Sequence, residues 1–295
     1  MNSIKPNFLI IGAAKSGTTS LFAYLKQHPE IFMPAMKETN YFALKNCNPE
    51  LNGPGDLNWY KSSITNEKDY LELFEVSETH LVIGEASPTY LHSACAPENI
   101  FNFNPDIKLI AILRDPRYRA LSYFHHCRRI GIEDMNNFME VLKMEKERKK
   151  RGWYWANHIH AGYYCQQLEN YYSYFPKKQI KVILLEDLIK FPKETIKGVF
   201  SFLEVNQFFE PKMDFIANRG YKTTLNILEK TFLKSQVLNR IVYAISPRLF
   251  NETKLKILLN IKMNNRDKQF LTDVYIKEVM RLEILINRNL SHWYS

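Results

Sequence analysis

Lys15 lies inside a loop bounded by Gly12 and Gly17, and this combination of residue types suits the binding of a phosphate group. Four apolar residues at 8–11 precede the loop, and hydroxyl side chains at 18–20 follow it. The pattern predicts a buried strand, a glycine-rich turn and the start of a helix, whose N–H groups and dipole would point at one anion. An ordinary turn of small residues between a strand and a helix is the alternative.

The position of the lysine separates this loop from that of the nucleoside triphosphatases. Their loop reads G-x-x-x-x-G-K-[ST], in which the lysine reaches the β- and γ-phosphates and the hydroxyl holds Mg²⁺. Here the two glycines have the same spacing, but Thr18 occupies the lysine position. The sequence therefore predicts a phosphate site without a Mg²⁺-dependent ATPase site.

A carboxylate next to aromatic residues is a second candidate for chemistry. Lys37 and Glu38 are adjacent and are followed by Tyr41 and Phe42. A carboxylate beside an aromatic wall near a phosphate loop can act as a general base. A surface ion pair is the alternative for Glu38, and the local sequence alone favours that alternative.

Arg114 follows the apolar run 107–113, which predicts a buried strand. A guanidinium at the end of such a strand calls for a phosphate or carboxylate partner. Ser122 lies about two helical turns further on, and His126 follows it by four residues. A structural or solvated role is the alternative for His126.

Alternating strands and helices must position these residues. Further buried strands are predicted at 80–83 and 180–185, with helical periodicity in the intervening segments. This alternation predicts an α/β fold with a P-loop-like central parallel β-sheet flanked by α-helices on both faces. Ligands gather beyond the carboxyl ends of the strands in such sheets.

Two other stretches carry polar or aromatic groups of undecided role. Glu85, Ser87 and Tyr90 follow the predicted strand 80–83 and could face the site or serve in capping and packing. The basic run 148–151 is most simply a solvated face that could attract an acidic acceptor. The aromatic residues at 153–155 suit sugar rings, nucleobases or domain packing.

The composition sets the class of partner. The chain has 295 residues, 45% of them apolar, and a formal net charge of +9. We predict one domain over 1–295 with a helical C-terminal part at 225–295. The positive charge favours anionic partners, although solubility alone could also explain it.

The expected location is cytoplasmic. No secretory h-region and no apolar run of about 18 residues is present, so no transmembrane segment is expected. The four cysteines are scattered without a C-x-x-C pair, which predicts neither a disulfide framework nor a zinc site.

Together these motifs resemble the sulfotransferase family that uses 3′-phosphoadenosine 5′-phosphosulfate (PAPS), and most of all its branch of heparan-sulfate sulfotransferases with their bacterial relatives. The resemblance covers residues 8–202 and returns at 271–293. It implies that one loop binds the 5′-phosphosulfate and that Arg114 and Ser122 hold the 3′-phosphate. The residues of that loop are Lys15, Ser16, Gly17, Thr18, Thr19 and Ser20.

The same resemblance assigns catalytic roles. Glu38 matches the proposed catalytic base, and Lys15 would stabilise the leaving group. His126 matches a histidine proposed for catalysis in the N-sulfotransferase branch, although Ile130 replaces its companion. The heparan enzymes also carry a lysine where Ala86 stands.

The resemblance also extends to one loop near residue 220. Arg219, Gly220 and Tyr221 occupy the place of a loop that covers the adenosine. The cysteine pair that staples this loop in the Golgi enzymes is missing, which agrees with a cytosolic, bacterial-type protein.

The implied activity is transfer of a sulfuryl group from PAPS to a hydroxyl or amine acceptor, a small molecule or more specifically a carbohydrate or glycoconjugate. No metal and no nucleic acid is expected. One alternative is a P-loop nucleotide kinase, for which Glu186 and Asp187 could supply a Mg²⁺-binding carboxylate but Thr18 replaces the required lysine. The other is a non-catalytic protein that binds anions or glycans.

Overall fold

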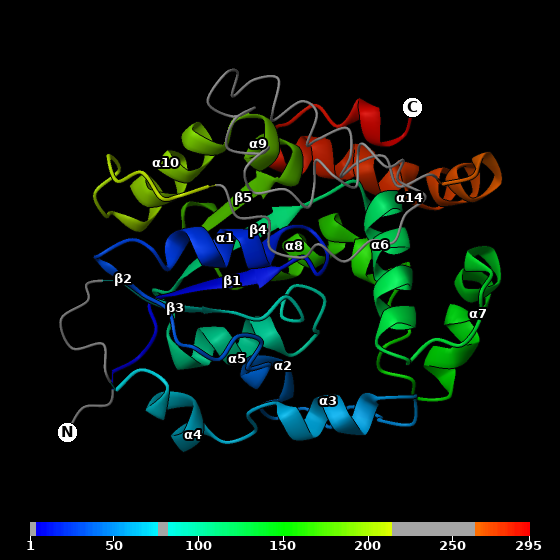
Figure 1. The fold of residues 1–295 in the computed structure, drawn as a ribbon, viewed down its shortest axis with the longest axis horizontal. Helices are drawn as coiled ribbons and strands as arrows, with labels where there is room; N and C mark the ends of the chain where they lie inside the picture. Colours follow the sequence, from blue (N-terminus) through cyan, green and yellow to red (C-terminus); the bar gives the residue numbers. More distant parts are fainter. Residues whose placement is uncertain (1–3, 76–81, 214–262) are drawn as a thin grey trace.

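Five parallel strands form one sheet in the part of the chain that the computed structural model describes, residues 4–75, 82–213 and 263–295. The strand order is β2-β3-β1-β4-β5 (Figure 1). Every neighbouring pair is parallel, which confirms the predicted central parallel sheet. The strands are β1 (Phe8–Gly12), β2 (Ile31–Phe32), β3 (Val82–Ala86), β4 (Lys108–Leu113) and β5 (Ile180–Leu184).

Side chains of the central strands alternate between two apolar cores. Leu9 and Leu109 belong to one core, and Ile10 and Ile110 belong to the other. Because both faces of β1 and β4 are covered, these strands read as continuous apolar runs. Removal of this much apolar surface from water is the main stabilising contribution to the fold.

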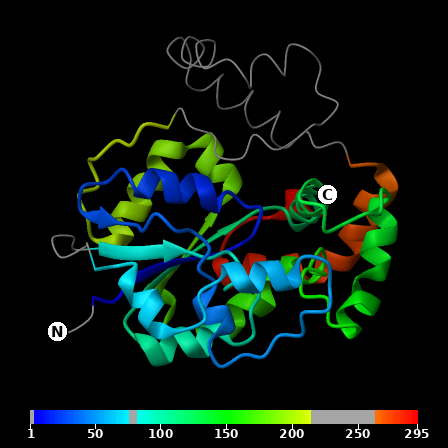
Figure 2. The same cartoon turned by 60° about the horizontal axis from the view of Figure 1, so that its bottom comes forward.

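Helices cover both faces of the sheet, as the sequence predicts. Figure 2 shows helices on both sides of the sheet. Side chains of α1, α9 and α10 pack into one core, and side chains of α2, α4, α5, α6, α7, α8 and α14 pack into the other. The helices of the first core are α1 (Thr18–Leu25), α9 (Leu185–Lys190) and α10 (Pro192–Leu203). The helices of the second core are α2 (Tyr41–Leu44), α4 (Glu67–Glu72), α5 (Ala96–Phe103), α6 (Pro116–Arg129), α7 (Phe138–Lys150), α8 (Tyr164–Tyr172) and α14 (Asn265–Ile286). A further helix is α3 (Asp56–Ser62). Three short 3₁₀ turns are described at His160–Gly162, Lys177–Gln179 and Ser291–Trp293.

Strand β3 lies further along the chain than the sequence predicts. Residues 80 and 81 lie outside the described residues, and the strand continues to Ala86. Gly84 makes this possible, because a Cβ atom there would lie 2.4 Å from the ring of Phe8 on the neighbouring strand. Glu85 and Ala86 are therefore strand residues and not part of the loop after it.

The cysteine prediction is wrong for one pair. Cys47 and Cys95 form a disulfide with their Cα atoms 6.5 Å apart, whereas Cys127 and Cys165 are buried free thiols. The pair is 48 residues apart in the sequence. Packing of α5 against the segment after α2 brings the two cysteines together, with Asn99 Nδ2 donating to the carbonyl of Phe42 at 3.0 Å. Such a tertiary contact leaves no local signal in the sequence.

None of the helices that the structure describes is long and apolar enough to cross a bilayer. The predicted helical stretch 225–262 lies outside the described residues.

Candidate active site

The loop between β1 and α1 has the form expected of an anion site. Lys15 adopts a left-handed backbone conformation with φ of 68°, and Gly17 follows with φ of 99°. A Cβ atom at Gly17 would lie 2.8 Å from a methyl group of Leu185, so both space and conformation favour glycine there. Thr18, Thr19 and Ser20 form the first turn of α1, which has no side-chain cap. The N-cap residue of the helix, Gly17, has no side chain that could pair with the first N–H groups.

Arg114 approaches this loop from the end of β4. It is 5% exposed, and its Nη1 lies 3.4 Å from the carbonyl oxygen of Lys15. Helix α6 begins two residues later at Pro116, with Asp115 as its N-cap. Ser122 is buried in the same helix. The structure thus places the arginine at the loop, on the element that the sequence predicts.

Glu38 lies on a short segment that is fixed to the sheet. Its backbone is left-handed with φ of 64°, and its N–H donates to the carbonyl of Ala86 at 2.9 Å. Two residues later the Asn40 side-chain amide donates to the Glu38 carbonyl at 2.8 Å. The Glu38 carboxylate contacts the amine of Lys37 and remains 55% exposed. The backbone is therefore fixed while the carboxylate stays accessible to a ligand.

A buried polar network supports the Glu38 segment from below. The Ser87 hydroxyl donates to the Glu85 carboxylate at 2.9 Å and accepts from the N–H of Asn40 at 3.1 Å. The hydroxyls of Thr39 and Tyr90 are 3.0 Å apart. Burial raises the pKa of Glu85 to about 7, and its hydrogen bonds oppose that rise. Glu85, Ser87 and Tyr90 are thus buried side chains whose hydrogen bonds support the Glu38 segment.

Positive charge is concentrated around Lys15. Its pKa is lowered to about 8, chiefly by burial and also by the charges of Arg129 and Arg114, while the charge of Glu38 opposes this lowering. Lys15 is therefore still mostly protonated at pH 7. The charges of Glu38 and Arg129 thus both act on the Lys15 amine. We call Lys15, Glu38, Arg114, His126 and Arg129 the phosphate-loop site.

Arg129 is a residue that the sequence reasoning missed. Its Nη2 lies 3.0 Å from Nδ1 of His126. Because a guanidinium can only donate, Nδ1 must carry the lone pair and Nε2 the proton. The pKa of His126 is lowered to about 4, chiefly by burial and also by the charges of Lys15 and Arg129. The spacing of three residues on one helix was the signal available in the sequence.

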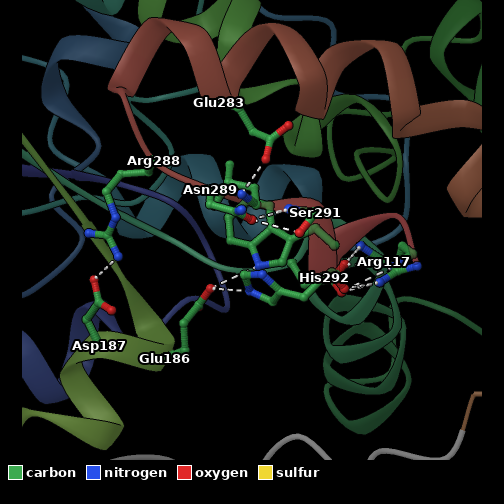
Figure 3. Close-up of polar contacts among 11 residues, drawn as sticks. Arg117, Glu186, Asp187, Glu283, Arg288, Asn289, Ser291 and His292 are labelled. Atoms are coloured by element: carbon green, nitrogen blue, oxygen red, sulfur yellow. Dashed lines mark hydrogen bonds and ion pairs between the residues drawn. The ribbon is translucent and has the colours of Figure 1, made fainter.

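Glu186 and Asp187, the carboxylates considered for a kinase, bind the C-terminal segment. Figure 3 shows Glu186 beside His292, with Oε1 at 3.1 Å from the imidazole Nε2 and 2.9 Å from the indole N–H of Trp293. Asp187 pairs with Arg288 at 2.8 Å. We call these contacts, with the Asp115–Arg117 pair, the C-terminal clamp.

Arg117 anchors the clamp from α6. Its Nη2 donates to the carbonyl of His292 at 3.0 Å (Figure 3). The same nitrogen donates to Asp115 at 2.9 Å, and Nη1 donates to Thr272 at 2.9 Å. The guanidinium is fully buried. Arg219, Gly220 and Tyr221, predicted to cover the adenosine, lie outside the described residues.

The basic run 148–151 is not a uniformly solvated face. Arg148 is buried, binds the Glu133 carboxylate and lies 4.7 Å from the ring of Trp153. Arg151 pairs with Glu147 on the helix surface at 3.1 Å. The expectation of a solvated run is therefore wrong for Arg148, because the carboxylate that binds it comes from another segment.

Comparison with known proteins gives one family. The sulfotransferase domain family matches residues 5–222. The chain is 36% identical over 120 residues to the membrane-associated sulfotransferase kil1 of Dictyostelium discoideum, which covers 41% of this chain and 22% of that protein. It is 29% identical over 215 residues to the bifunctional heparan sulfate N-deacetylase/N-sulfotransferase 4 of Mus musculus, covering 68% and 22%. The chain thus matches about a fifth of the length of these relatives.

A shorter relative and two solved structures complete the comparison. Human heparan sulfate glucosamine 3-O-sulfotransferase 5 is 27% identical over 233 residues, covering 73% of this chain and 58% of that protein. The crystal structure of a sulfotransferase from Alicyclobacillus acidocaldarius has a TM-score of 0.80 and 29% identity, covering 99% of this chain and 100% of that one. Mouse sulfotransferase SULT7A1 complexed with PAP has a TM-score of 0.52 and 12% identity, covering 93% and 85%, and shows the shared fold alone.

Proposed function

Because the chain belongs to the sulfotransferase domain family, we propose that it transfers a sulfuryl group from PAPS to a hydroxyl or amine of a carbohydrate or glycoconjugate. The observation that carries this proposal is the surplus of positive charge at Lys15, with Arg114 at the same loop and the Glu38 carboxylate close by. Relatives whose names specify heparan sulfate support a glycan acceptor.

The residues present fit the anionic groups of PAPS. The uncapped first turn of α1 and the Lys15 amine offer donors for the 5′-phosphosulfate. Arg114 and Ser122 would hold the 3′-phosphate. An anion at this place would offset the repulsion that lowers the pKa of Lys15. The fold shared with a sulfotransferase complexed with PAP agrees with this assignment.

PAPS supplies an activated sulfuryl group whose leaving group is a phosphate. Glu38 would accept the proton of the acceptor hydroxyl as the new O–S bond forms. Lys15 and the loop N–H groups would stabilise the charge that develops on the departing phosphate when the old S–O bond breaks. His126, neutral and protonated on Nε2, would act as a hydrogen-bond donor and not as the base.

Calorimetric titration with 3′,5′-adenosine bisphosphate, ATP and 5′-AMP tests the cofactor assignment. The expected result is tight binding of the bisphosphate and weak binding of the other two. Arg114→Ala should lose the bisphosphate, whereas Arg128→Ala, an exposed arginine on α6, should retain it. Equal affinity for ATP, or no binding of the bisphosphate, would contradict the proposal.

The kinase alternative is not favoured, because both of its candidate carboxylates are bound in the C-terminal clamp. Its lysine position is occupied by Thr18, which is buried in the first turn of α1. Dependence of turnover on Mg²⁺ would reopen it.

A further inference from the structure

A cavity of about 520 Å³ lies between the segment after α2, the turn before α5 and the end of α7. Its walls include residues 46–50, 92–95, 149 and 152–154, together with Asn157 and His160. None of the residues of the phosphate-loop site lines it. The volume is within the range of roughly 300–1,000 Å³ found for small-molecule sites.

The walls combine aromatic rings with neutral hydrogen-bonding groups. Trp153 and Tyr154 line the cavity. Burial lowers the pKa of His92 to about 3 and that of His160 to about 4, so both imidazoles are neutral at pH 7. Asn46, Asn48 and Asn157 also line the cavity, and the Asn157 amide nitrogen donates to the carbonyl of Tyr154 at 2.6 Å. Amides and neutral imidazoles each offer a donor and an acceptor.

The charged groups on the walls do not favour a polyanion. Among the residues that the structure describes, one cation, Lys149, and one carboxylate, Glu50, line the cavity. Nδ1 of His160 is buried and has no hydrogen-bond partner in the described part of the chain. A buried polar atom without a hydrogen bond carries an uncompensated desolvation cost.

A disulfide fixes two of the walls. Cys47 and Cys95 belong to the two opposing segments, and both cysteines line the cavity. A covalent link between walls limits the conformational freedom that binding would otherwise remove. The relative position of these two wall segments is therefore restricted before a ligand arrives.

Helix α3 links the cavity to the Glu38 segment. The ring of Tyr154 stacks on Trp59 with centroids 4.1 Å apart. The carbonyl of Trp59 accepts from the Ser63 hydroxyl at 2.9 Å, and that hydroxyl accepts from Asn40 at 2.9 Å. Asn40 in turn donates to the carbonyl of Glu38. A few contacts thus join the wall of the cavity to the proposed base.

We propose that this cavity is a saccharide subsite that binds uncharged sugar units of the acceptor, away from the position that receives the sulfuryl group. The hydroxyls of a sugar both donate and accept, as the amides and imidazoles do, and its C–H faces pack on aromatic rings. The assignment rests on the proposed function for its role in catalysis, but binding of the sugar can be measured by itself.

The experiment is an NMR titration of the full chain with cellobiose, lactose, maltose and N,N′-diacetylchitobiose. At least one disaccharide should shift the Trp153 indole signal. His160→Gln should weaken that disaccharide about tenfold, because one hydrogen bond is lost. Lys150→Ala, an exposed neighbour outside the cavity, is the matched control and should bind as the wild type does.

Trp153→Ala is a second variant, although it also removes the ring beside Arg148. Titration of each variant with 3′,5′-adenosine bisphosphate verifies that the fold and the phosphate-loop site are intact.

The outcomes separate the two proposals. Disaccharide binding that His160→Gln weakens, with bisphosphate binding unchanged, supports the subsite. Bisphosphate binding without binding of any disaccharide, or disaccharide binding that neither variant alters, overturns the subsite and leaves the proposed function standing. Disaccharide binding without bisphosphate binding overturns the proposed function and retains the subsite.

Discussion

The phosphate-loop site and the C-terminal clamp both concentrate charge near the carboxyl ends of the strands, but they compensate it differently. In the clamp, Asp187 pairs with Arg288 and Glu186 with His292. In the phosphate-loop site, the charges of Arg129 and Arg114 both lower the pKa of Lys15, and Glu38 only partly opposes them.

This difference indicates what each region does. Paired charges of the clamp hold the C-terminal segment on α9 and α6, so their contribution is to stability. Accumulated positive charge is unfavourable in the free protein and becomes favourable when an anion binds. Substitutions should therefore affect rate in one region and stability in the other.

Glu38→Gln should give the largest effect, a loss of turnover of about 10²- to 10⁴-fold. The reason is that the glutamine amide cannot take up the proton that the hydroxyl of the sugar loses. The side chain is 55% exposed, so the free energy of unfolding should change by less than about 0.5 kcal/mol. Turnover of PAPS with a glycan acceptor and urea unfolding are the two measurements. Glu147→Gln, on the surface of α7, is the control. A variant that binds the bisphosphate normally and keeps full turnover would refute the role of Glu38.

Arg117→Ala should show the opposite behaviour and lower the free energy of unfolding by about 3–5 kcal/mol, the range for breaking a buried ion pair. Burial raises the pKa of the Asp115 carboxyl and Arg117 opposes that rise, so its loss leaves a buried carboxylate without its ion partner. Urea unfolding measures the change. Arg128→Ala removes an exposed arginine from the same helix and should cost far less. Equal losses in the two variants would mean that the clamp does not stabilise the chain.

Arg129→Ala tests charge accumulation inside the phosphate-loop site. Removal of this guanidinium should raise the pKa of His126 above its value of about 4, because one of the charges that lower it is lost. The pKa should stay below 6.5, because burial is the larger cause of the shift. NMR titration of the imidazole measures it, with Arg128→Ala as control. An unchanged titration would show that the 3.0 Å contact does not form in solution.

Much of the fold could be predicted because strands buried on both faces and amphipathic helices leave local patterns. The phosphate loop is also local, since Lys15, Gly17 and Thr18 lie within four residues. The family match agrees with the resemblance drawn from these motifs. The roles of Glu38 and of the other site residues stay predictions, because they depend on a bound cofactor.

What the sequence did not predict depends on contacts between distant segments. The disulfide joins cysteines 48 residues apart, and Glu186 meets His292 across 106 residues. Neither pairing has a spacing rule, because packing of whole helices brings the partners together. Glu85 is a similar case, since only burial under the Glu38 segment raises its pKa to about 7.

The last expected effect concerns the pH dependence of folding stability, which should have opposite signs for His292 and His126. Glu186 raises the pKa of His292 in the folded state, so this pair stabilises the chain below pH 6.5 and the stabilisation is lost as pH rises through the raised pKa. His292 is more than half exposed, so the effect should be a few tenths of a kcal/mol. His292→Gln should therefore cost more stability at pH 6 than at pH 8 in urea unfolding.

His126 has the opposite sign, because its folded pKa of about 4 lies below its ordinary value of 6.5. Between these two values mainly the unfolded state binds the proton. His126→Gln should therefore cost less stability at pH 5 than at pH 8, again in urea unfolding. If the two variants showed the same sign, the opposite directions assigned to the pKa shifts of His292 and His126 would be wrong.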